Sequence, residues 1–267
     1  MENKITELVF IIDRSGSMSG LESDTIGGFN SMLKQQQSVD GKAFVTTVLF
    51  DDEYELLHDR VDIQNVKPLT EEDYTTRGTT ALLDAIGKTI HNIRKAQKEA
   101  YDEDRSEKVM FFIITDGQEN ASRRYTAQMI QDRIKHYKKK HGWEFLFFGA
   151  NMDAIAEAAK IGIDANRAQN YCSDSVGTAS VYTSMSAVST AFRTGNKIRS
   201  HTDNHSQDAK GALLKLKRAM KALKESTDEM QSEYEGLIGT AKANGGKIPD
   251  VNEILRQILS ENNKEDK

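Results

Sequence analysis

The first apolar run of the chain ends in three oxygen-bearing side chains at alternate positions. Asp13, Ser15 and Ser17 follow residues 8–12, a run that is too short and too β-branched to form a helix. In a tight loop that opens a helix, this spacing can turn one carboxylate and two hydroxyls toward a common centre. Hard oxygen ligands suit Mg²⁺ or Mn²⁺. The stretch therefore predicts a metal-binding loop after a buried strand.

Two later polar segments also follow apolar or irregular stretches. Arg77-Gly-Thr-Thr80 ends a long irregular region, and Thr115-Asp-Gly117 closes the continuous apolar run of residues 109–115. Open parallel sheets bind ligands beyond the carboxyl ends of their strands, where the strand order reverses. Each segment alone is weak, because Ser/Gly-rich loops and Asp-Gly pairs are common turns. Together they predict that three loops meet at one site.

Strands and helices are expected to alternate along most of the chain. Apolar spacing predicts strands at residues 8–12, 43–50, 54–57, 109–115, 143–148 and 168–172, and helices at 26–37, 82–93, 129–137, 155–159 and 181–192. The short polar connection at residues 51–53 predicts a hairpin with one antiparallel edge strand, and residues 58–80 are expected to form a long loop. The pattern predicts an α/β class, with a doubly wound, mostly parallel sheet.

Three motifs resemble a known family. Asp13-Arg-Ser-Gly-Ser-Met-Ser-Gly20, Gly78-Thr-Thr-Ala-Leu82 and Ile114-Thr-Asp-Gly117 are similar, in order, to motifs of the von Willebrand factor type A (vWA) domain. The similarity extends over about residues 5–196 and is strongest to bacterial and phage members. It implies a Rossmann-like vWA fold with a metal-ion-dependent adhesion site (MIDAS).

The resemblance also implies which side chains hold the metal. Asp13, Ser15 and Ser17 match the first loop, and Asp116 matches the aspartate of the third. Thr80 is chosen for the second loop because relatives place their ligand directly before a run like residues 81–86. The neighbouring Thr79 is then expected to cap the following helix.

The ligand set favours binding over catalysis. Two carboxylates balance a dication, while neutral hydroxyls and waters complete an octahedron at ~2.0–2.1 Å and leave one position open. An Asp or Glu carboxylate of a protein partner would suit that position. No histidine lies near the three motifs, and no Gly-x₄-Gly-Lys-Ser/Thr phosphate loop is present, so we expect no enzyme activity.

Two other functions use the same loops. A metal-dependent hydrolase would cleave a phosphoester, although the second aspartate that many such enzymes carry two residues after the first is replaced by Ser15. A structural assembly protein would use the metal only to stabilise its fold. Four charged residues flank the loops, and the arginines among them are interpreted either as rim charges that orient an acidic partner or as solvated surface residues. The four residues are Arg77, Glu119, Arg123 and Arg124.

Composition limits the partners. The chain has 267 residues and a formal charge of -5, which gives no general affinity for nucleic acid or anionic membranes. We find no signal peptide and no spanning segment, and the single cysteine, Cys172, fits a reducing cytosol, so a cytoplasmic location is expected. Bacterial vWA domains often act beside ring-forming AAA+ ATPases, so the resemblance suggests such a partner. His201 and His205 form a weaker candidate for a transition-metal site.

The C-terminal region differs in composition from the rest. The domain is expected to span residues 1–196, followed by a polar linker at 197–207 and a helical tail at 208–267. The tail carries a coiled-coil seam of apolar residues three and four apart, a Gly-rich turn and a short second helix. Its basic half precedes its acidic half, which predicts antiparallel self-association. Packing of the tail on its own domain is the alternative.

Overall fold

The structure is a computed structural model that describes residues 5–101, 104–150 and 152–196. Its strands are β1 (Thr6–Asp13), β2 (Ala43–Phe50), β3 (Tyr54–Asp62), β4 (Lys108–Thr115), β5 (Glu144–Ala150) and β6 (Ala168–Tyr171). Its α-helices are α1 (Glu22–Gln37), α2 (Leu82–Glu99), α3 (Ala127–His141), α4 (Ala154–Lys160) and α5 (Ser175–Thr194). Strand and helix alternate as the sequence predicts.

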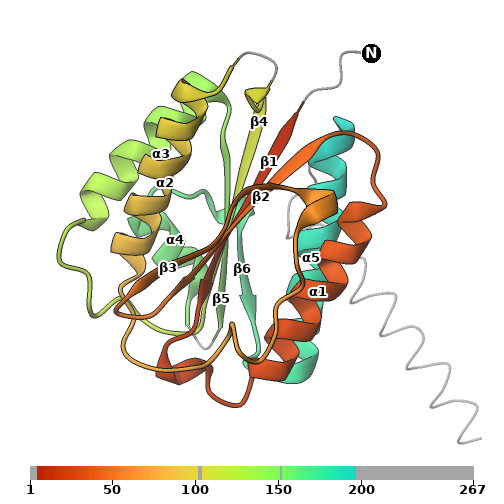
Figure 1. Cartoon of the computed structure of the whole chain (residues 1–267). Helices are drawn as coiled ribbons and strands as arrows, with labels where there is room; N and C mark the ends of the chain where they lie inside the picture. The colour runs from red at the N-terminus through yellow and green to blue at the C-terminus, as the bar shows by residue number, and fades with distance from the viewer. Residues whose placement is uncertain (1–4, 102–103, 151, 197–267) are drawn as a thin grey trace, which may run out of the picture. The chain divides into compact units, whose positions relative to one another are not determined.

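The six strands form one sheet in the order β3-β2-β1-β4-β5-β6 (Figure 1). All neighbouring pairs are parallel except β2 and β3, which are antiparallel at the edge. The prediction of a doubly wound sheet with one antiparallel edge strand is confirmed. The strand order reverses between β1 and β4, where Ile12 pairs with Ile114. The carboxyl ends of these two strands therefore lie side by side, which places Asp13 next to Thr115.

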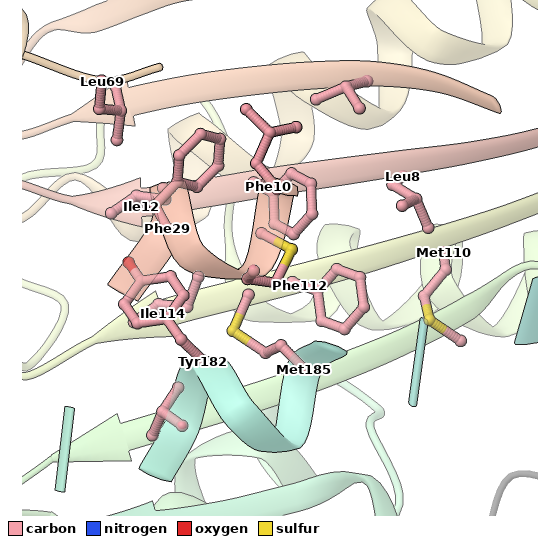
Figure 2. Packing of buried hydrophobic residues seen from close by; sticks show 14 of the residues in the cluster. Leu8, Phe10, Ile12, Phe29, Leu69, Met110, Phe112, Ile114, Tyr182 and Met185 are labelled. Atoms are coloured by element: carbon pink, nitrogen blue, oxygen red, sulfur yellow. The ribbon is translucent and has the colours of Figure 1, made fainter. Parts of the chain in front are cut away.

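Helices cover both faces of the sheet, with α1 and α5 on one side and α2 and α3 on the other (Figure 1). Central strands must then be apolar on both faces, which explains their continuous apolar runs. On the first face, the ring of Phe10 lies 5.1 Å from Phe112 in a stacked pair and 5.5 Å from Phe29 of α1 (Figure 2). On the second face, Ile11 packs with Ile86 of α2. These two cores hold the helices against the two faces of the sheet.

One strand is longer than predicted. β3 continues to Asp62, whereas the sequence predicted its end at residue 57 and a loop from 58. Its register with β2 shifts on either side of Thr47, and Arg60 adopts a positive φ of 49°. An irregular register breaks the two-residue alternation by which strands are recognised. The loop that leads toward Thr80 therefore begins later, after a short helical turn over Ile63–Asn65.

The C-terminal predictions lie outside the described residues. These are the polar linker at 197–207, the helical tail at 208–267 with its coiled-coil seam and self-association, and the pair His201 and His205. The last described helix, α5, ends at Thr194, and Gly195 follows it in a left-handed cap with φ 76°. Within the described ranges, no helix has the length and apolar character that crossing a membrane requires.

Candidate metal centre

Three loops from the carboxyl edge of the sheet meet at one point. The first loop leaves β1 and forms a short helical turn over Gly16–Met18, and the third leaves β4. Ser17 Oγ donates a hydrogen bond of 2.6 Å to Asp116 Oδ1, and Ser15 Oγ lies 3.1 Å from Ser17 Oγ. The structure thus brings together side chains that the sequence places 99 positions apart.

Hydroxyl groups of the first two loops surround a small space beside Gly117 of the third loop. A methyl carbon placed on Gly117 would lie 2.7 Å from Thr80 Oγ1, 3.1 Å from Ser17 Oγ and 3.5 Å from Ser15 Oγ. Only glycine at this position keeps that space open. We call the three hydroxyls of Ser15, Ser17 and Thr80 the hydroxyl cradle. Its donor atoms are of the type that Mg²⁺ and Mn²⁺ prefer.

Two buried carboxylates belong to the same site. Asp13 is fully buried and accepts hydrogen bonds from Ser15 N (2.7 Å) and Thr115 Oγ1 (2.5 Å). The pKa of Asp13 is raised to about 6, chiefly by burial and to a lesser degree by the nearby Asp116, against the lowering effect of these hydrogen bonds. Burial also raises the pKa of Asp116, against the lowering effect of its bonds to Ser17 and Ser173.

Burial raises the pKa of both carboxylates, which is the shift expected of acidic groups without a compensating charge. Across the described ranges, no lysine or arginine forms an ion pair with Asp13 or Asp116. A bound dication would supply that charge, so the donor set of two carboxylates and three hydroxyls fits the implied metal. The described part of the chain holds no group of three or more His, Cys, Asp or Glu side chains arranged for a metal. The candidate centre depends on hydroxyl oxygens for most of its donors.

An ion-pair network around the buried Asp51 ties the first two loops together. Asp51, at the end of β2, accepts hydrogen bonds from Arg14 Nε (3.1 Å) and Arg77 Nε (2.8 Å). The backbone adds two bonds, from Arg77 N to Arg14 O (2.8 Å) and from Gly16 N to Gly78 O (3.2 Å). Arg77 also pairs with Glu53. Its guanidinium therefore contributes to the loop structure, although the side chain is 52% exposed.

The two candidate threonines of the second loop differ in burial and in their contacts. Thr80 is buried with its hydroxyl in the cradle, and its backbone N–H donates to Asn120 Oδ1 at 2.9 Å. Thr79 is exposed, and its N–H donates to Asp52 Oδ1. Helix α2 begins after Ala81 and has no side-chain cap from that residue. The expectation that Thr79 caps this helix is wrong.

Residues from the third loop satisfy the start of α2 instead. Glu119 Oε2 accepts from Leu83 N (2.9 Å), and Ser122 Oγ accepts from Asp84 N (3.0 Å). The carboxylate of Asp84 in turn accepts the backbone N–H groups of Arg123 and Arg124. Glu119 is therefore a structural carboxylate that orders the start of α2. The side chains of Arg123 and Arg124 are exposed.

Some contacts of the site were missed in the sequence. Ser173, between β6 and α5, has its Oγ 3.5 Å from Asp116 Oδ2. Tyr74 donates a hydrogen bond from its hydroxyl to Asp13 O at 2.5 Å. Ser173 follows the end of β6, as Asp116 follows the end of β4, and this position could have identified it in the sequence. No sequence feature indicated the contact of Tyr74 with Asp13, because this contact depends on how the long loop folds back. Cys172, beside Ser173, is exposed and free.

The sheet order, the antiparallel edge strand and the helices on both faces make a vWA-like α/β fold. The chain resembles the pilus adhesin SpaC from Lactobacillus rhamnosus GG with a TM-score of 0.54 at 12% identity, over 70% of this chain and 30% of that one. Identities this low show the fold alone. No protein-family model matches the chain, and no curated protein matches it.

Two further solved structures have this arrangement at lower scores. The vWF domain of the type V pili tip protein Mfa5 from Porphyromonas gingivalis matches at 11% identity and TM-score 0.49, over 70% of this chain and 97% of that one. Proximal thread matrix protein 1 from the mussel byssus, whose structure has a zinc-occupied MIDAS motif, matches at 14% identity and TM-score 0.48. The match covers 70% of this chain and 46% of the byssus protein, so this chain spans less than half of that relative.

Proposed function

We propose that this chain is a protein-interaction module that binds an acidic group of a partner through a divalent cation. Asp13, Ser15, Ser17, Thr80 and Asp116 would hold Mg²⁺ or Mn²⁺. The observation that supports this most strongly is the hydroxyl cradle, in which three loops leave one small space that a methyl carbon on Gly117 would fill. A bound cation supplies positive charge and an open coordination position for an acidic oxygen.

The chain's own residues favour binding over turnover. Both carboxylate oxygens of Asp13 already accept hydrogen bonds, from Ser15 N and from Thr115 Oγ1. Asp116 accepts from Ser17 and Ser173. Each of these oxygens keeps a further lone pair with which it would bind a cation, and a carboxylate engaged in this way is not free to remove a proton. Among the described residues, no histidine forms a hydrogen bond with these five side chains. The hydroxyl groups and carboxylates therefore act as a preformed holder for a charged ligand.

A rigid holder suits reversible recognition. The backbone bonds between the first two loops, and the bonds of Asn120 with Thr80, order the site before a partner arrives. Ordering these groups in advance lowers the entropy cost of association. The partner then contributes a single Asp or Glu carboxylate at the centre, with surrounding contacts setting specificity. We include in this proposal that the domain has no catalytic role of its own.

Partner capture from a cell extract tests the proposal. Wild type, Thr80→Val and Thr79→Val are compared as baits, each in Mg²⁺ and in chelator. Thr80 and Thr79 are adjacent, but only Thr80 has its hydroxyl in the cradle. We expect a partner that wild type and Thr79→Val retain in Mg²⁺, and that chelator or Thr80→Val releases. Equal retention in all conditions would contradict the proposal, as would Mg²⁺-dependent phosphoester hydrolysis by wild type.

A further inference from the structure

A cavity lies near the amino ends of the parallel strands, whereas the candidate metal centre lies at their carboxyl ends. The cavity has a volume of about 510 Å³ and lies at the carboxyl ends of α2 and α3, which run side by side on one face (Figure 1). The amino ends of β4 and β5 are close by, because Glu107 and Trp143 line it. An eight-residue strand such as β4 separates the two sites by roughly 20 Å or more.

Basic side chains dominate the lining of this cavity. They are Arg94, Lys98, Arg105, His136, Lys140 and His141, and the acidic side chain among the lining residues is Glu107. Beneath them, the buried rings of Tyr137 and Trp143 stack with their centroids 4.4 Å apart. The rings of His136 and His141 lie 6.2 Å from each other. The cavity thus has an aromatic floor and a positively charged rim contributed by two helices.

Basic residues near the carboxyl ends of helices have an ordinary structural role. The carboxyl end of a helix carries about half a negative charge, and cations there stabilise it. Arg105 has this role, because it donates to Gln97 O and Ala100 O at the end of α2. Two helix ends and Glu107 together offset about two of the four permanent positive charges. Counted over the lining residues alone, about two positive charges remain.

Three of the cations are not used by the fold. Arg94, Lys98 and Lys140 are exposed, and none of them forms an ion pair with any residue in the described ranges. They come from two different helices and line the same cavity. Burial lowers the pKa of His141, and the positive charges of Lys140, His136 and Arg94 lower it further. The positive charges around His141 therefore lie close enough to influence one another within one cavity.

We propose that this cavity is a second binding site, for a small molecule that carries two or more phosphate groups. Its volume lies in the range of small-molecule sites, and a single phosphate would leave much of it unfilled. A ligand with several phosphate groups supplies the two or more negative charges that the rim lacks. Arginine and lysine both bind phosphate oxygens through charge-assisted hydrogen bonds. Arg94, Lys98 and Lys140 are assigned as the residues that hold the phosphate groups.

Calorimetric titration of the full chain with tripolyphosphate, ATP and citrate tests this site. The experiment is done in chelator, so that the phosphate groups cannot bind through a divalent cation. We expect tripolyphosphate and ATP to bind with a stoichiometry of one, and citrate at least tenfold more weakly. Equal affinities of the two phosphate ligands assign recognition to the phosphate groups alone, and tighter binding of ATP adds a nucleoside contact. No binding of either phosphate probe, or binding of citrate as tight as that of tripolyphosphate, would overturn the proposal.

A matched pair of double variants separates a defined site from general charge attraction. Lys98→Gln/Lys140→Gln removes two cations that line the cavity, and Lys95→Gln/Lys135→Gln removes two exposed lysines of the same helices that do not. Both variants change the net charge equally. We expect the first to raise the Kd for tripolyphosphate at least tenfold and the second to change it less than twofold. Equal weakening by both would contradict a site at this cavity.

Discussion

The hydroxyl of Ser17 donates a 2.6 Å hydrogen bond to the carboxylate of Asp116, which joins the loop after β1 to the loop after β4. The two strands are neighbours at the point where the strand order reverses. This contact, with Thr80 Oγ1 beside the same space, makes three distant segments into one site. The following predictions test that site and the contacts that hold it.

Thr80→Val should weaken metal binding without unfolding the domain. The substitution keeps the shape of the side chain and removes one oxygen from the hydroxyl cradle. We expect the affinity for Mn²⁺, measured by calorimetry, to fall at least about tenfold, as is typical when a metal site loses a supporting group. Thr79→Val is the control and should bind as wild type does, because Thr79 is exposed. Equal effects of the two substitutions would place the ligand elsewhere.

Asp13→Asn should stabilise the metal-free protein at neutral pH. The pKa of Asp13 is about 6 in the folded state against an ordinary value of 3.8, so the folded state binds more protons between these values. Stability is therefore highest at low pH in this window and falls as pH rises. Between pH 5 and 7 the loss from Asp13 is roughly 1 kcal/mol.

An asparagine can take the place of Asp13 without leaving a donor unpaired. Its carbonyl accepts from Ser15 N, and its amide donates to Thr115 Oγ1, which can donate to Gly117 O. Urea unfolding in chelator at pH 5 and pH 7 measures the effect. Wild type should lose more stability than Asp13→Asn over this interval. A larger loss in Asp13→Asn would show that the carboxylate is stabilised, not strained, in the metal-free site.

The sequence predicted the architecture because the apolar periods of the strands and helices were clear. Strand ends also predicted the site, since in a parallel sheet the residues after β1 and β4 must be neighbours. Thr80 could be chosen over Thr79 only through the family resemblance, and its burial now gives a physical reason. The metal itself stays a prediction.

Other features could not be predicted, for identifiable reasons. The end of β3 was misplaced because the register shift near Thr47 breaks the alternation of side chains. The role of Asp51 was missed because its partners, Arg14 and Arg77, lie 37 and 26 positions away and carry no periodic signal. Long-range polar contacts of this kind depend on loop conformation, which local sequence does not specify.

Asp51→Asn should destabilise the fold and weaken metal binding together. Asp51 is fully buried and accepts from both Arg14 and Arg77, so the substitution removes the carboxylate that the two arginines share and leaves each with one ion pair, to Glu55 and to Glu53. Breaking a buried ion pair in this way costs about 3–5 kcal/mol. The loss is measured by urea unfolding, and the Mn²⁺ affinity should fall because the first two loops lose their link.

An exposed ion pair provides the control for Asp51→Asn. Asp104 pairs with Lys42 at 2.9 Å, but the two side chains are 49% and 41% exposed. Asp104→Asn should therefore change stability by less than about 1 kcal/mol. Metal affinity should not change. Similar small effects of the two substitutions would mean that the network around Asp51 does not hold the loops.

The most direct test of the central claim is titration of Mn²⁺ into wild type, Gly117→Ala and Gly27→Ala, followed by electron paramagnetic resonance. Gly117→Ala removes no oxygen, but its methyl group would occupy the space within the hydroxyl cradle. A methyl group on Gly27 meets nothing within 4 Å, so that variant controls for the substitution itself. Wild type and Gly27→Ala should each bind one Mn²⁺, and Gly117→Ala should bind none. No binding by wild type, or equal binding by all three, would contradict the assignment of a metal to this site.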